Sequence, residues 1–410
     1  MITLKRNIAI NQDKLKQYTL AKASIGEAVQ LARAWKDKTT LAYALDYQGL
    51  SAYEHKDYER SLESYSESEK IYQQLNDLKK VISTKKNIAN ILRDMKKGAL
   101  ALAKHQERLN IAEKTDAATQ ADILWDMAFI YGAEKKTIKK SEELYLAAIK
   151  HYQTLGDTSS VVTVYGNIGY NYRDVNDSTT AYRFHQKGIQ YIEKSRRYPD
   201  IVLALEKMAN TARHFKNRKK EIIHNRLAIS YARAQGDWVK AASLANAIGD
   251  ALTDTKQFDQ ALEAYQEGME FGKKGNDPAA EASNIWDFSY VSGENLGKRD
   301  QALAGYKRAF ELYLLAHDSV NAATMLSNVG QVLWKKKEFE KAIAAHQEAI
   351  EFSKRCKNDD QIAYSWSKLA DLYRETNNPV ASAVSLNESV LALETLNDST
   401  KISAGYFDLG

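Results

Sequence analysis

The sequence predicts an all-α protein built from about ten tandem helix-turn-helix repeats. Three observations carry this prediction: small residues recur about every 40 residues, apolar residues within each period follow helical spacing, and only 3 prolines occur in 410 residues. A proline inside a helix costs about 3 kcal/mol, so this scarcity favours long uninterrupted helices. No segment sustains the alternation of apolar and polar residues that marks a strand.

The repeat is visible in columns of equivalent positions that keep their phase along the chain. Three columns consist mainly of small residues, and they begin at Ala9, Ala21 and Ala28. A fourth column, which begins at Ile25, consists of larger residues and lies between the second and the third. Such regular self-similarity is the signature of a repeat array. The first column of small residues contains Ala9, Gly49, Ala89, Ala128, Gly169, Ala209, Gly249, Gly330, Ala370 and Gly410.

Each period divides into two helices. Apolar and small residues recur at helical spacing in residues 39–56, and a second helical pattern runs from Tyr58 to Leu75. Gly tolerates the left-handed conformation that ends a helix, and Asp accepts hydrogen bonds from the free N–H groups of the next helix. The chain carries such predicted stops at Lys36-Asp37, Asn76-Asp77, Gly156-Asp157, Gly236-Asp237, Asn276-Asp277 and Asn397-Asp398.

The periodicity divides the chain into ten predicted repeats and a fragment of an eleventh. Residues 399–410 have the pattern of a first helix cut at its small residue, so we expect the protein to continue beyond Gly410, because an unpaired apolar helix lacks a packing partner. The predicted repeats span approximately residues 1–38, 39–78, 79–118, 119–157, 158–197, 198–237, 238–277, 278–318, 319–358 and 359–398.

Two repeats depart from the pattern. In the repeat that starts near Ile201, Glu221 and Asn225 occupy positions where a small and an aromatic residue are expected. The repeat around Trp286 contains a one-residue slip.

The spacing of these residues resembles the tetratricopeptide repeat family over essentially the whole chain. The period of 40 residues is longer than the 34 of the common form, and the family's proline at the end of the second helix is absent. Both features are similar to the long-helix variant of bacterial regulatory and sensor arrays. The family's spacing stands intact in Ile168-Gly169-x-x-Tyr172 with Ala181, Ile248-Gly249-x-x-Leu252 with Phe258 and Ala261, and Val329-Gly330-x-x-Leu333 with Phe339 and Ala342.

The resemblance implies a right-handed superhelical solenoid that acts as a protein- or peptide-binding scaffold. It also implies, by association with the fold alone, the recognition or sensor region of a larger bacterial signalling or regulatory protein. The output region and the oligomeric state stay open.

The motifs of common enzyme classes are absent from the sequence. There is no zinc-protease, P-loop, nucleophile-elbow or dinucleotide-binding signature. Cys356 is the single cysteine, which excludes an internal disulfide framework and a Cys-rich zinc site. His105, His185 and His346 fall in the column of larger residues, where we expect them to pack rather than to bind a metal. We therefore expect a non-catalytic protein without a cofactor or a metal.

The chain shows no signal for membrane insertion. No run of 18 or more apolar residues occurs, and the N-terminus lacks the apolar stretch of a secretory signal. We expect a cytoplasmic protein; a signal trimmed from before Met1 would instead make it exported or periplasmic.

Charge is unevenly distributed along the chain. The formal net charge of +5 comprises 0 over residues 1–78, +12 over residues 79–237 and −7 over residues 238–410. A basic stretch of this kind can steer a charged partner, although its lysines could equally be solvating the outer faces of helices.

Polar residues recur on one face of the first helix of each repeat, offset from the apolar stripe. Asn offers a donor and an acceptor to a peptide unit, and Arg offers a bidentate fork to a carboxylate. The resemblance implies that Asn87 and Asn167, two residues before the small residue, grip the backbone of a ligand peptide. The alternative is a merely solvated face. The predicted peptide-binding residues of the concave groove are Asn87, Asn90, Arg93, Asn167, Tyr170, Arg173, Asn210 and Arg213.

Two functions are compatible with these features. The first is binding of a protein or an extended, acidic peptide along the groove of residues 79–237. The second is binding of nucleic acid by the same basic segment, which would require phosphate contacts and a steep dependence on salt. The acidic C-terminal part and the absence of a nucleic-acid-binding motif make the second function the less favoured alternative.

Overall fold

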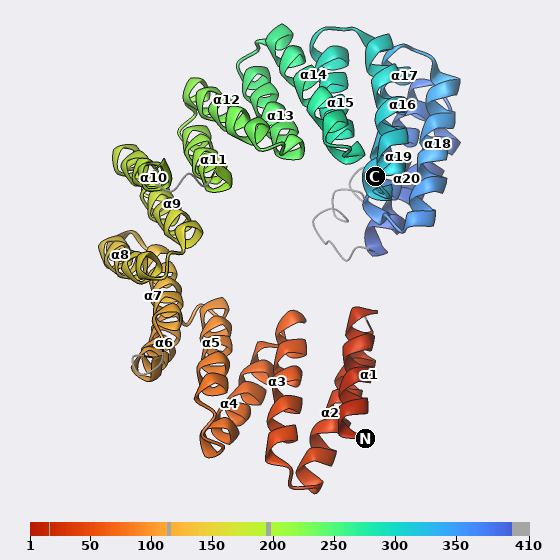
Figure 1. Ribbon diagram of the computed structural model, residues 1–410. Coiled ribbons are helices and arrows are strands. Elements are labelled where there is room, and N and C mark those ends of the chain that lie inside the picture. The colour runs from red at the N-terminus through yellow and green to blue at the C-terminus, as the bar shows by residue number, and fades with distance from the viewer. Residues whose placement is uncertain (16, 113–115, 194–197, 396–410) are drawn as a thin grey trace. The chain divides into compact units, whose positions relative to one another are not determined.

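The computed structural model describes residues 1–15, 17–112, 116–193 and 198–395. In these residues the chain forms twenty α-helices and no β-strand, which confirms the all-α prediction (Figure 1). The predicted start of an eleventh repeat at 399–410 lies outside the described residues. The chain divides into two compact units, Met1–Tyr191 and Ile192–Gly410, which are described one at a time below.

The first unit is a succession of helical hairpins. Most of its helices have 17 residues, and short turns join them. The helices are α1 (Ile2–Lys14), α2 (Tyr18–Ala34), α3 (Lys38–Glu54), α4 (Tyr58–Gln74), α5 (Leu78–Asp94), α6 (Gly98–Ala112), α7 (Ala117–Gly132), α8 (Ile138–Thr154), α9 (Thr158–Asp174) and α10 (Ser178–Glu193), the last of which ends just past the division.

The second unit repeats the same hairpin with one interruption, a π-helical turn at Val291–Asn295. The helices are α11 (Tyr198–His214), α12 (Arg218–Ala234), α13 (Trp238–Asp254), α14 (Phe258–Lys274), α15 (Pro278–Tyr290), α16 (Arg299–Leu315), α17 (Ser319–Lys335), α18 (Phe339–Cys356), α19 (Asp359–Glu375) and α20 (Pro379–Thr395).

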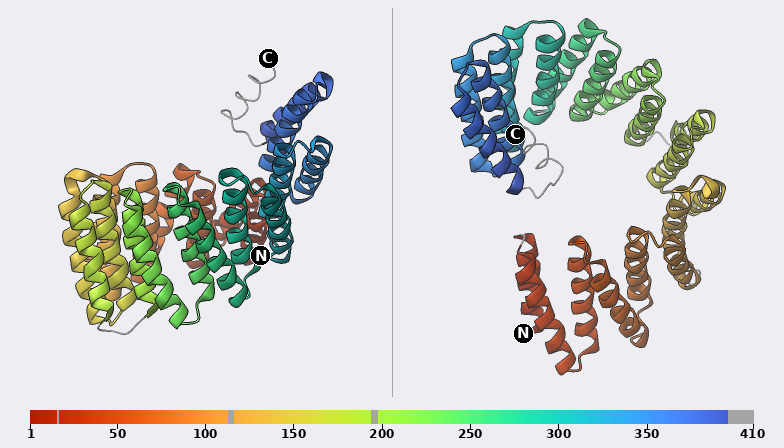
Figure 2. Two further views of the ribbon diagram at one scale, coloured as in Figure 1. Left: turned by 90° about the horizontal axis from the view of Figure 1, so that it is seen from above. Right: turned by 180° about the vertical axis from the view of Figure 1, so that it is seen from behind.

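Within each unit the odd-numbered helices form a layer of their own. Consecutive helices pack against each other from α1 to α9 and from α11 to α20, and direct contacts also join α1 to α3, α13 to α15 and α17 to α19. Figure 2 shows this stacking from two further directions. The predicted binding residues all lie on odd-numbered helices, so this layer positions the candidate site.

Most helices end at a residue in the left-handed conformation, and these residues are 20 or 21 apart over long stretches of the chain. Lys56 has φ 60° and Asn76 has φ 55°, while Gly156 and Gly236 occupy the same position in other turns. An Asp follows most of these residues and caps the next helix: Asp37 Oδ1 accepts from the backbone N–H of Thr40 at 3.0 Å. The predicted stops are confirmed, apart from Asn397-Asp398, which lies outside the described residues.

The columns of small and large residues pair in space. A Cβ added at Gly49 would lie 2.7 Å from the ring of Tyr65, and one added at Gly249 would lie 2.4 Å from the ring of Tyr265. The first helix of a hairpin therefore needs a small residue because a ring from the second helix lies directly against its backbone.

The histidines of the large-residue column serve the same packing purpose. His105, His185 and His346 are all buried. Burial lowers the pKa of His105 and of His346 to about 4, so both rings are neutral near pH 7. This agrees with the expected packing role.

The one-residue slip near Trp286 has a structural cause. After α15 the chain makes the π-helical turn Val291–Asn295, and Gly297 then reverses the chain with φ 68°. A π-helical turn absorbs one extra residue without breaking the helix, and such turns often lie at functional sites. Among the described helices, none has the length and apolar character needed to cross a membrane.

Candidate binding site

Three of the predicted residues lie on α5, and two of them, Asn90 and Arg93, are hydrogen-bonded to each other. Asn87, Asn90 and Arg93 are all half-buried. Arg93 Nε donates to Asp94 Oδ1 at 2.9 Å, and Arg93 Nη1 donates to Asn90 Oδ1 at 3.3 Å. The guanidinium also lies 5.7 Å from the centre of the exposed Phe129 ring of α7. The arginine is thus oriented by its neighbours while it remains open to solvent on one side.

The equivalent residues of α9 form a second cluster of the same design. Arg173 Nε donates to Asp174 Oδ1 at 2.7 Å, and the guanidinium lies 4.4 Å from the centre of the Tyr170 ring. Tyr170 in turn makes an edge-on contact with His185 at 5.5 Å. The side chain of Asn167 is hydrogen-bonded to buried Tyr145. Each cluster therefore combines an oriented arginine with an amide or an aromatic ring.

The remaining two predicted residues lie on α11 in the second unit. Asn210 is exposed. Arg213 Nε donates to Glu221 Oε1 of α12 at 2.6 Å. The structure therefore places the predicted residues in local clusters on α5, α9 and α11, and Arg213 belongs to a pocket that the repeat pattern alone does not reveal.

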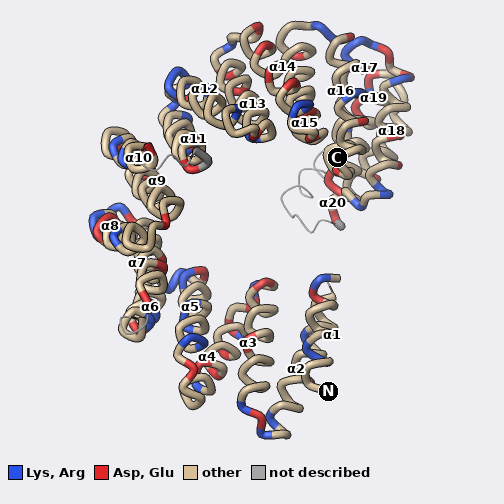
Figure 3. Tube along the Cα trace, in the orientation of Figure 1, with Lys and Arg blue, Asp and Glu red and all other residues tan. Residues whose placement is uncertain are grey.

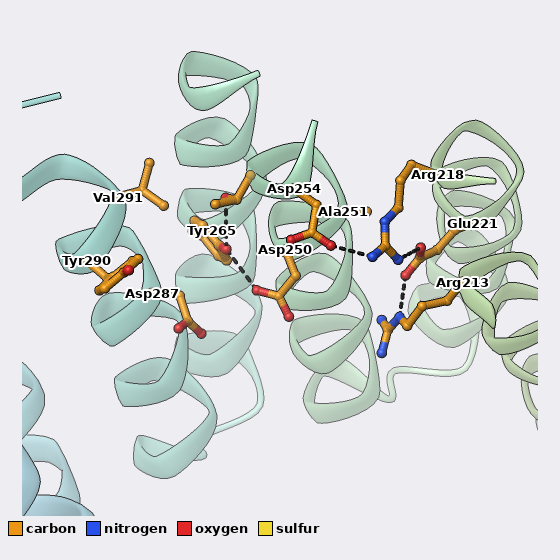
Figure 4. A pocket seen from close by; sticks show the side chains of 11 residues that line it. Arg213, Arg218, Glu221, Asp250, Ala251, Asp254, Tyr265, Asp287, Tyr290 and Val291 are labelled. Carbon is orange, nitrogen blue, oxygen red and sulfur yellow. Dashed lines mark hydrogen bonds and ion pairs between the residues drawn. The ribbon is translucent and has the colours of Figure 1, made fainter. Parts of the chain in front are cut away.

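This pocket has a volume of about 370 Å³ and is formed by α11 to α15 together with the first residue of the π-helical turn (Figure 4). Its lining carries both signs of charge and two aromatic rings. The lining residues are Arg213, Arg218, Glu221, Asp250, Ala251, Thr253, Asp254, Tyr265, Asp287, Tyr290 and Val291.

One wall of the pocket is built around a buried carboxylate. Glu221 is 0% exposed and stands where most other repeats have Ala or Ser. Arg213 Nε lies 2.6 Å from one carboxylate oxygen, and Arg218 Nη1 lies 2.7 Å from the other. Arg218 also forms an ion pair with Asp254. A buried charge needs such partners because the interior cannot solvate it.

The opposite wall carries two aspartates whose hydrogen-bond donors are neutral. Tyr265 Oη donates to Asp250 Oδ1 at 2.8 Å, and Asn246 Nδ2 donates to Asp287 Oδ2 at 2.8 Å. Burial raises the pKa of Asp287 to about 6, and the negative charge of Asp250 adds to this rise. Burial also raises the pKa of Asp250, against the opposing effects of the Tyr265 hydrogen bond and of Arg213.

The two departures from the repeat pattern meet at this pocket. Glu221 comes from one, and Tyr290 and Val291 stand at the start of the π-helical turn that accommodates the other. The sequence pattern singled out Arg213 as a residue of a peptide-binding groove, and it did not single out Arg218, Asp254 or Asp287. The signal that could have identified this pocket was the departure of Glu221 and of the segment near Trp286 from the repeat pattern. Positions at which a protein breaks the local sequence rules are often functional or strained.

The arrangement of the described side chains does not suggest a metal-binding site. Among the side chains that the structure describes, no three His, Cys, Asp or Glu residues are arranged to hold a metal ion. The pocket can instead hold a charged or hydrogen-bonding group of an organic ligand.

Comparisons with known proteins agree with the helical repeat. Residues 294–355 and 321–395 match a family model described as tetratricopeptide repeat. No curated protein sequence matches the chain.

Several solved structures are similar to this chain at low identity. A Signal Transduction ATPase with Numerous Domains from Pyrococcus horikoshii, described as having a tetratricopeptide repeat sensor, is similar with a TM-score of 0.50 and 14% identity. That match covers 92% of this chain and 54% of the other, so the chain spans about half of that protein. BtubC from P. vanneervenii has a TM-score of 0.45 and 14% identity, over 54% of this chain and 92% of that one. Aspartyl phosphate phosphatase F from Bacillus subtilis has a TM-score of 0.44 and 13% identity, over 96% and 94%.

Proposed function

This chain is a tetratricopeptide repeat protein, and from that premise we propose that it is a non-catalytic scaffold that binds an extended segment of a partner protein. The observation that carries the proposal is the recurrence, on two first helices of hairpins, of an Asn followed six residues later by an Arg that pairs with the next Asp. Asn87 and Arg93 on α5 correspond to Asn167 and Arg173 on α9, 80 residues later in each case. Repeated Asn and Arg side chains suit a ligand whose own backbone repeats along its length.

The partner segment that suits these clusters is acidic. Arg93 and Arg173 each pair with one carboxylate, that of the Asp next in the chain, and such partly exposed pairs contribute little stability. A carboxylate of the partner can therefore share either guanidinium at small cost and gain a charge-assisted hydrogen bond.

A nucleic-acid ligand is less well supported. Figure 3 shows basic and acidic residues on the same helices, such as α5 and α8. Several basic groups of residues 79–237 are already paired: Lys85 Nζ lies 2.6 Å from Glu69, and Arg108 Nη1 lies 2.9 Å from Asp126. Fewer cations are then available for phosphates than the net charge of the segment suggests.

The proposal extends to the role of the chain in a larger system. We place it in the cytoplasm as the sensor or recognition region of a bacterial signalling or regulatory protein. The similar architecture in the Pyrococcus horikoshii protein, whose repeats are described as a sensor, supports this role by analogy of fold.

Changing Arg93 and Arg173 together to Ala is expected to weaken binding of acidic peptides about ten- to a hundredfold, because a hydrogen bond to a charged group contributes about 1.5–3 kcal/mol. The peptides would be selected against the full chain from a random display library, and their affinities measured by calorimetry at two salt concentrations. The dependence of affinity on salt should also become shallower.

The matched control is Arg33→Ala on α2, an even-numbered helix, where Arg33 Nη2 forms an exposed pair with Glu67. This variant should bind like the parent chain. Unchanged affinity and salt dependence in the Arg93/Arg173 double variant, or selection of no peptide at all, would contradict the proposal.

A further inference from the structure

We infer that the pocket between α11 and α15 receives a basic side chain, arginine or lysine, from the bound segment of the partner. This inference rests on the proposed function and assigns one subsite within it. It differs from the acidic preference of the α5 and α9 clusters, because the chemistry of this pocket is different.

The ion pairs of the pocket leave two carboxylates facing its interior. Arg213 and Arg218 are bound to Glu221, and Arg218 also pairs with Asp254. Asp250 and Asp287 are held by a phenol and an amide, which are neutral donors. Figure 4 shows these two aspartates, which come from α13 and α15, on the same side of the pocket and across it from Glu221 and the two arginines.

A cation placed between the two aspartates would relieve an unfavourable arrangement. The negative charges of Asp250 and Asp287 repel each other, and part of their solvation is lost in the pocket. A guanidinium has donors on two edges and can serve two carboxylates at once, whereas an ammonium offers three rotatable donors. Both groups meet the requirement, and the planar fork of arginine suits two separate acceptors better.

The rest of the lining suits the stem of such a side chain. Tyr290 is 52% exposed at the edge of the pocket, and Val291 and Ala251 provide apolar surface. Arg and Lys bury their methylene groups along apolar surface while their charged ends reach polar partners, and aromatic rings add cation–π attraction. A volume of about 370 Å³ lies within the range of small ligand pockets.

An acidic group fits this pocket poorly. The guanidinium Nε of Arg213 is engaged by buried Glu221, and a carboxylate entering the pocket would meet Asp250, Asp254 and Asp287. Arg213 therefore acts here as a positioning residue for Glu221 and the α11–α12 wall. This assignment departs from the sequence-based expectation that Arg213 contacts the partner directly.

The test uses the full chain and the capped tripeptide acetyl-Gly-Arg-Gly-amide, observed by saturation-transfer NMR. We expect saturable binding, with at least tenfold weaker binding of the matching citrulline peptide, which has nearly the same shape without the charge. Asp250→Asn combined with Asp287→Asn should also weaken arginine binding at least tenfold. The control Asp259→Asn changes an exposed acid on α14 outside the pocket and should leave binding unchanged.

Three outcomes would overturn the inference: no saturable binding of the arginine peptide, equal binding of the citrulline peptide, or unchanged binding by a double variant with the parent's circular dichroism spectrum and melting temperature.

These results are distinct from failure of the proposed function. If the selected long peptides depend on Arg93 and Arg173 but tolerate replacement of every basic residue, only the pocket assignment fails. If no long peptide is selected while the arginine tripeptide binds, the scaffold proposal fails instead.

Discussion

Replacing Arg213 and Arg218 together with Met is expected to lower the free energy of local unfolding of α11 to α13 by about 3–5 kcal/mol. This is the usual cost of leaving a buried charge without its partner. Glu221 is 0% exposed, and both of its carboxylate oxygens accept from these two arginines. Methionine keeps much of the apolar stem of arginine, so the expected loss reports on the charge. Hydrogen exchange of the α11–α13 amides measures it locally, which a repeat array requires because its parts can open separately.

A rescue variant separates this cause from general damage to the hairpin. Glu221→Ala, added to the double variant, should recover most of the lost free energy, because Ala181 and Ala261 fill the same column in the flanking repeats. The matched control is Arg226→Met on α12, where an exposed arginine pairs with Glu267. Its expected effect is below about 1 kcal/mol. A loss of similar size in the control, or a failure of Glu221→Ala to rescue, would show that the buried ion pairs are not the cause.

Gly272→Ala is expected to destabilise the α14–α15 hairpin by about 1–3 kcal/mol, the usual cost of overpacking. A Cβ at this position would lie 2.6 Å from the backbone N and 2.8 Å from the Cα of Glu281. Backbone atoms of a helix cannot rotate away as a side chain can, so the two helices would have to separate. Exchange of the α14 and α15 amides, together with the denaturation midpoint of the chain, measures the loss.

Gly26→Ala is the opposite case and serves as its control. Gly26 lies in the middle of α2, and a Cβ there would have no neighbouring atom within 4 Å. Alanine should therefore stabilise α2 by about 0.5–1 kcal/mol, since it loses less backbone entropy than glycine on folding. Similar losses in both variants would mean that the effect comes from removing glycine and not from the contact with α15.

The two clusters on α5 and α9 show how much equivalent positions in a repeat can predict about the surroundings of a side chain. Arg93 and Arg173 share a column, and each is oriented by the Asp that follows it in the chain, so sequence spacing predicted residues with equivalent local environments. Arg213 belongs to the same column but has a different environment, because Glu221 lies eight residues later on the next helix and accepts its hydrogen bond. The column fixes the position of a residue on its helix, whereas the partner of its side chain depends on the residues of the neighbouring helix.

The sequence by itself determined the all-α class, the positions at which helices end, and the need for small residues at regular intervals. These features depend on interactions within a few residues, such as an Asp that caps the N–H three residues ahead, and on a period that every repeat shares. Only the tertiary structure decided which side chains meet. The pocket draws its lining from residues 213 to 291 on five helices, and its charge balance depends on which acid each arginine reaches. Ion pairs form between charged groups that are close in space, so the partner of each arginine depends on how the hairpins pack together.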